Sequence, residues 1–207
     1  MTRIAKIVKS NSHVDYIGRV IDRLDADAPP AASDYGFAQF VSMPLDDGSE
    51  TVGVIYNTLL ANPEYGQFGP RLSSQAELSV LSPDYLNEQG VLVGILLLGW
   101  REPAGEGERR RGAKVHQGVP RAVVPVGQDV FGMSEREAQE FHRGAADGRV
   151  QLHYFSQVLA HTGAFAVPLI EAILEQLEPA STPEERQRFC VLKRSLVWQR
   201  TLGQVRL

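Results

Sequence analysis

The densest apolar run in the chain, residues 91–100 (VLVGILLLGW), constrains the fold more than any other stretch. It is too short to span a bilayer, which needs about 20 apolar residues. Its glycines, Gly94 and Gly99, would each cost a helix interior roughly 1 kcal/mol relative to alanine. In a strand, glycine marks a bend or a close approach of another backbone. The run therefore favours a strand buried on both faces, and a core helix is the alternative.

Short strand patterns, each containing a glycine, precede this run. They lie at residues 16–23, 35–43 and 50–60. The dipeptide Asp47-Gly48 between the last two is a typical hairpin turn. Residues 118–131 add one or two short strands, which their prolines restrict to edges or ends. Because repeated glycines bend a sheet into a barrel, we expect a small closed β-barrel of five to seven strands over residues 1–131.

Two irregular stretches interrupt the strand patterns. Residues 61–90 are punctuated by Gly and Pro and form an insertion in the barrel. Residues 101–114 are the most loop-like part of the chain and contain the triplet Arg109, Arg110 and Arg111. Clustered arginines are candidate contacts to nucleic-acid phosphates. Because Glu106 and Glu108 dilute this charge, a solvated hairpin tip is the alternative interpretation.

The apolar period becomes helical after residue 131. Ser134 with Glu137 forms a capping-box pattern. A second helix is indicated by Leu152, Phe155 and Leu159, which share one face. The strongest start signal is Thr182-Pro183, with an acid three residues after the threonine. We therefore expect an α+β protein, with a helical appendage at residues 132–207.

Two apolar stripes in this appendage, at residues 170–177 and 189–196, must be buried somewhere. One possibility is that they pack on the protein's own barrel. The other is that part of a stripe is shared between subunits of a homo-oligomer. In the second case the candidate interface residues are Ile173, Leu177, Leu192 and Leu196.

Composition excludes several classes of protein. The net charge of −4 provides no protein-wide basic field for nucleic acid. The only cysteine, Cys190, excludes an internal disulfide and any cysteine-based zinc site, and its helical setting predicts a small core residue. The charged N-terminus does not resemble a secretory signal. We expect a cytoplasmic protein that does not enter a membrane.

No catalytic constellation can be recognised in the sequence. The five histidines show no zinc-protease spacing, and there is no Gly-x-Ser-x-Gly elbow. The phosphate loop Gly-x-x-x-x-Gly-Lys-Ser/Thr is also missing. The sequence therefore predicts no enzymatic activity, no catalytic residue, no metal, no cofactor, and neither binding nor hydrolysis of nucleoside triphosphates.

Four segments resemble the barrel domain shared by HerA-type DNA translocases and rotary ATP synthases. They are residues 17–23 (Ile-Gly-Arg-Val), 51–60 (Val-Gly-Val-Ile), 93–99 and 125–130 (Pro-Val-Gly-x-x-Val). The resemblance covers roughly the first 133 residues. It implies a domain that helps to form hexameric rings and to dock a partner nuclease. The chain departs from that family after Phe131. Where such a translocase would carry its phosphate loop, residues 159–166 contain a His-Thr-Gly that is not followed by Gly-Lys-Ser.

Two functional hypotheses follow. The first is a non-catalytic assembly or adaptor module that binds itself or a protein partner, such as a HerA-type translocase and nuclease system. The second is a nucleic-acid-binding accessory protein that contacts DNA through Arg109–Arg111.

Overall fold

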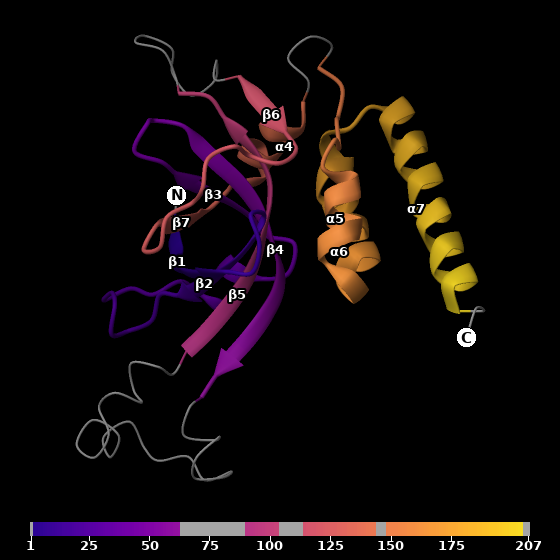
Figure 1. Cartoon of the computed structure of the whole chain (residues 1–207). Helices are drawn as coiled ribbons and strands as arrows, with labels where there is room; N and C mark the ends of the chain where they lie inside the picture. Colours follow the sequence, from indigo (N-terminus) through magenta and orange to yellow (C-terminus); the bar gives the residue numbers. More distant parts are fainter. Residues whose placement is uncertain (1, 63–89, 104–113, 144–147, 205–207) are drawn as a thin grey trace.

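The computed structural model describes residues 2–62, 90–103, 114–143 and 148–204, with side chains as far as residue 196. The strands in this part of the chain are β1 (Arg3–Ser10), β2 (Asp15–Val20), β3 (Phe40–Pro44), β4 (Glu50–Ala61), β5 (Gly90–Arg101), β6 (Val115–Gln117) and β7 (Asp129–Gly132). All pairings are antiparallel, in the order β2-β1-β7-β3-β4-β5-β6. A further β2–β5 pairing closes six of the strands into a barrel, and β6 remains outside as an extension of β5 (Figure 1). The predicted α+β fold with an N-terminal barrel is confirmed.

The apolar run that opened the sequence analysis is the strand β5. Every residue from Val93 to Gly99 is buried, so both faces of the strand are covered. One face lies against the barrel core, and helices cover the other (Figure 1). Its partner β4 is buried in the same way from Thr51 to Tyr56. An added Cβ on Gly53 of β4 would lie 2.8 Å from Ile95 Cγ2, so this close strand contact requires glycine.

The structure corrects one predicted strand and adds one that was not predicted. Residues 35–43 do not form one strand, because a 3-10 helix, η1 (Ala32–Tyr35), precedes a turn and β3 begins only at Phe40. Ala38 in that turn has a left-handed φ of 65°. The first strand, β1, was not predicted, because its charged Arg3, Lys6 and Lys9 hide its buried residues. The insertion at residues 61–90 lies almost wholly outside the described residues.

The helical half contains α4 (Glu135–His142), α5 (Phe155–His161), α6 (Ala166–Leu177) and α7 (Pro183–Gln204). Short 3-10 segments, η3 (Gly163–Phe165) and η4 (Glu178–Ala180), join the last three. The Ser134 capping box is confirmed, with Glu137 N–H 3.4 Å from Ser134 Oγ. The predicted face at residues 152–159 is wrong, because α5 begins at Phe155 and buries Gln157 and Val158 while Leu159 is exposed.

The apolar stripes pack within the single chain. Ile173, Leu177 and Leu196 are almost fully buried in one core that also contains the barrel side chains, and Leu192 is half-buried against it. Within the chain, the stripe at residues 170–177 is buried in the core that the helices share with the barrel, and the stripe at residues 189–196 packs on α6. A role of these residues between subunits stays a prediction. Cys190 is exposed on α7, contrary to the core position expected for it. Helix α7 forms the outermost layer of the helical side (Figure 1).

Glutamine side chains join the helices to the barrel. Gln157 on α5 donates to the Leu97 carbonyl of β5, and Gln176 on α6 donates to the Ala38 carbonyl at 2.9 Å. Buried carbonyls that lack a strand partner would otherwise cost free energy. The helices are therefore part of the same packed unit as the barrel.

Candidate functional site

The buried histidine, His142, lies in the core and has a structural role. Its Nδ1 lies 2.6 Å from the Ala138 carbonyl, and its Nε2 lies 2.6 Å from the Tyr154 hydroxyl. The carbonyl can only accept, so Nδ1 carries a proton, and in the neutral ring Nε2 then accepts from the hydroxyl. Burial lowers the pKa of His142 to about 4 and raises that of Tyr154. Almost fully buried, this pair joins α4 to the residue before α5 and packs against Phe40 of the barrel strand β3, with the His142 and Phe40 ring centroids 5.1 Å apart.

Buried carboxylates are also used structurally. Glu185 accepts backbone N–H groups from Val150 at 2.9 Å and Thr182 at 2.8 Å. Burial alone would raise the pKa of Glu185, but these hydrogen bonds outweigh it and lower the value. Asp15 accepts the Tyr56 hydroxyl at 2.8 Å. Within the described ranges, no group of three or more His, Cys, Asp or Glu side chains could hold a metal ion.

A concavity lined by aromatic, histidine and arginine side chains lies where β6 pairs with β5. This cavity of about 270 Å³ is lined by Trp100, Val115, His116, Gln117, Phe141, Arg143, Gln151 and His153. Trp100 and His116 are directly opposite each other in the β5–β6 pairing. Their rings are stacked, with centroids 4.7 Å apart and planes inclined by 12°. The two rings therefore lie face to face in the cavity wall, so that a further planar group could stack only on an outer face of this pair.

A hydrogen-bonded frame fixes the opposite wall. Gln117 Nε2 donates to the carbonyls of Phe141 at 3.2 Å and Gln151 at 3.0 Å, and its Oε1 accepts the backbone N–H of His153 at 2.8 Å. Arg143 donates from Nη1 to the Gly148 carbonyl at 2.7 Å and from Nη2 to the Ala180 carbonyl. The frame holds the cavity open in one shape.

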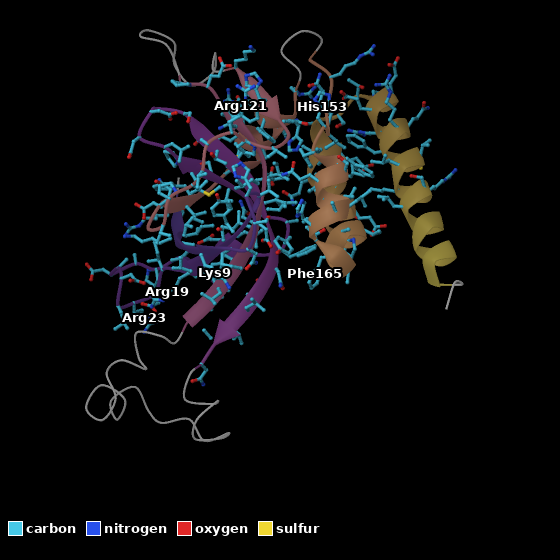
Figure 2. All side chains as sticks on the ribbon, in the orientation of Figure 1. Lys9, Arg19, Arg23, Arg121, His153 and Phe165 are labelled. Carbon is cyan, nitrogen blue, oxygen red and sulfur yellow. The ribbon has the colours of Figure 1, made fainter. Side chains whose placement is uncertain are left out.

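The charge of this cavity is positive or neutral. Arg143 is a permanent cation, and none of the described lining residues is acidic. The nearest carboxylate in the hairpin, Glu102, is engaged by His116 Nε2 at 2.6 Å and by Lys114 at 3.8 Å. Figure 2 shows Arg121 and His153 at the same end of the molecule, while Lys9, Arg19 and Arg23 lie at the other. A planar, electron-rich or anionic group suits such a site.

A second surface feature joins the barrel to the helices. Phe37 follows η1 and Phe165 ends η3; they are 45% and 42% exposed. Their ring centroids are 6.1 Å apart, within the range of an aromatic pair. The two rings form one exposed apolar patch from two distant parts of the sequence.

The candidate contact and interface residues named from the sequence are not the residues that form the cavity or the Phe37–Phe165 patch. Arg109, Arg110 and Arg111 lie outside the described residues, in the segment that connects β5 to β6. Ile173, Leu177 and Leu196 belong to the core, with Leu192 at its margin. Of the four that the structure describes, none lines the Trp100–His116 cavity.

Sequence reasoning missed the cavity because its walls depend on strand register. Trp100 and His116 are separated by the loop-like residues 101–114, and no turn motif there fixes which residues pair. Gly99 was the available signal. An added Cβ there would lie 2.1 Å from the His116 carbonyl oxygen, so the glycine records the close approach of β6.

The comparison with known families covers almost the entire chain. No helix in the described part of the chain has the length and apolar character that crossing a membrane requires. A search of the curated proteins gave no match. The family model described as a domain of unknown function, DUF8166, matches residues 1–206 and thus spans both the barrel and the helices. The chain belongs to this DUF8166 family.

Proposed function

We propose that this protein is a non-catalytic binding module, in which the barrel and its helices act as one rigid unit that docks a protein partner or a second copy. The exposed Phe37–Phe165 pair is the observation that carries the proposal. Aromatic side chains are enriched at protein interfaces, where a few of them supply most of the binding free energy. Both rings are attached to the packed body of the protein, so binding costs little conformational entropy.

The buried polar groups agree with a role without catalysis. His142, Glu185 and Gln157 each have their hydrogen-bonding capacity used inside the fold. A general acid or base must reach the proton it transfers, and His142 is completely buried. The resemblance of residues 17–23 and 93–99 to the HerA-type barrel supports a DNA translocase or its nuclease as the class of partner.

The test is a comparison of two surface variants. Phe37→Ser combined with Phe165→Ser removes the aromatic pair, and Val191→Ser removes a single exposed apolar side chain on α7 as the matched control. Light scattering measures self-association, and co-purification from the native host measures partner binding. We expect the double variant to lose the assembly while its circular dichroism stays unchanged. A wild-type protein that stays monomeric and recovers no partner would contradict the proposal.

A second candidate function is binding of nucleic acid at the β5–β6 end. The stacked Trp100–His116 pair beside Arg143 favours it, because aromatic and cationic groups together bind single strands. Fluorescence anisotropy with a labelled single-stranded oligonucleotide at increasing salt measures this activity. We expect Arg109–Arg111→Gln to weaken binding and flatten its salt dependence. Arg23→Gln, at the far end in Figure 2, should change neither.

A further inference from the structure

We propose that the cavity between Trp100, His116, Arg143 and His153 holds one unstacked base of a single-stranded nucleic acid. The inference rests on the second candidate function and assigns it a specific site among the described residues. The size of the cavity sets the first limit. At about 270 Å³ it lies just below the roughly 300–1,000 Å³ of common small-molecule sites, so it takes one planar group and not a large ligand.

The aromatic surface determines the kind of group. The Trp100 and His116 rings are nearly parallel, at 12°, and are held by paired backbone on adjacent strands. His116 is also fixed by Glu102 at 2.6 Å. A preformed stack of this kind can take the face of a base on its outer ring, which adds a third layer without reading the sequence. Bases in a duplex are already stacked, so the site selects a base that is extruded or single-stranded.

The charge of the cavity suits the attached phosphate. Arg143 uses Nη1 and Nη2 on two carbonyls, but a guanidinium has five N–H donors. Donors therefore remain for a phosphate oxygen beside the stacked base. His153 presents its exposed ring at the same cavity, while its backbone N–H is held by Gln117. None of the described lining residues is acidic. The nearby carboxylates are both engaged by the fold, Glu102 by His116 at 2.6 Å and Glu185 by the backbone N–H groups of Val150 and Thr182.

The test uses the fluorescence of Trp100. The chain has two tryptophans, so Trp198→Phe leaves Trp100 as the only indole. An unlabelled oligothymidylate or oligouridylate is titrated into this protein at low salt. Because a stacked base quenches indole emission, we expect a saturable loss of fluorescence with the same midpoint as the anisotropy of a labelled strand. Trp100→Leu in the full-length wild-type chain should weaken binding about tenfold, and Arg23→Gln should not.

The outcomes separate the cavity from the function on which it depends. Salt-sensitive binding without quenching would leave the nucleic-acid function standing and overturn this site. No binding of either oligonucleotide would overturn both. If Trp100→Leu fails to fold, the quenching of the Trp198→Phe protein still decides. Quenching by an aromatic peptide but by neither oligonucleotide would show that a protein side chain fills the cavity, and would also overturn the proposal.

Discussion

The seam between the barrel and the helices and the β5–β6 end use similar residue types in opposite ways. At the seam, both ring nitrogens of His142 and the amide of Gln157 are used within the fold. At the β5–β6 end, His153 is exposed and Arg143 keeps donors that no carbonyl takes. A histidine or an arginine is therefore not a functional signal by itself. The two regions differ in whether a polar side chain at an accessible surface can still form a hydrogen bond.

The largest expected effect breaks the seam. Ile173→Glu places a carboxylate in a core site that is 1% exposed. An unpaired buried charge costs several kcal/mol, so we expect a loss of about 3 kcal/mol or more and an unfolded protein. Circular dichroism and urea unfolding measure it.

The matched control for this substitution is Val191→Glu on α7, because Val191 is 68% exposed. It should change stability by less than about 0.5 kcal/mol. Burial of Ile173 within the chain argues against the interface role predicted for it from the sequence. A folded, monomeric Ile173→Glu protein would support that interface role instead.

The next effect is the acid sensitivity of the seam. The pKa of His142 is lowered to about 4 in the folded protein, and an unfolded histidine has a pKa near 6.5. Between these values the unfolded state binds the extra proton, so stability falls as the pH is lowered. Between pH 7.5 and pH 5 the loss is about 2 kcal/mol.

Urea unfolding at several pH values across this window measures the slope. His142→Asn should flatten it, because no group at this position then titrates. The exposed His153→Gln should leave the slope unchanged. A wild-type stability that stays constant from pH 7.5 to pH 5 would contradict the neutral, buried state of His142.

How much of this contrast the sequence could predict differs between the two regions. The strand β5, the capped starts of α4 and α7 and the change to helix after residue 131 are local patterns, and each was predicted. The seam depends on distant pairs such as Gln176 with Ala38, which no local period encodes. The cavity depends in addition on the β5–β6 register and on the α4–α5 connection. Cys190 was misplaced because helical spacing gives a face but not its direction.

A smaller effect is confined to the β5–β6 end. Gly99→Ala places a Cβ 2.1 Å from the His116 carbonyl oxygen, so β6 must move away from β5. Because β6 lies outside the closed ring, the barrel should keep its fold at a cost of about 1 kcal/mol or slightly more. The Trp100–His116 stack should be lost, and with it the oligonucleotide-dependent quenching of Trp100.

Gly90→Ala in the same strand is the control for this variant. The nearest atom to its Cβ would be Arg19 Nε at an ordinary 3.5 Å, so both the stability and the quenching should be unchanged. Normal quenching in the Gly99→Ala protein would show that binding does not need the stacked pair.

The smallest expected effect is none: ATP should neither bind with a micromolar Kd nor be hydrolysed. A phosphate loop follows a strand and opens a helix, so that its backbone N–H groups face the phosphates. Here residues 159–166 end α5 and pass through η3, and the Thr162 hydroxyl donates to the Val158 carbonyl at 2.8 Å. The cavity at the β5–β6 end offers a free nucleotide one stacking contact and the single cation Arg143, without a cradle of backbone N–H groups for a triphosphate. Titration calorimetry with ATP and Mg²⁺ should therefore show no heat of binding under conditions in which an oligonucleotide quenches Trp100. Micromolar binding of ATP would show that a nucleotide site exists elsewhere in the chain.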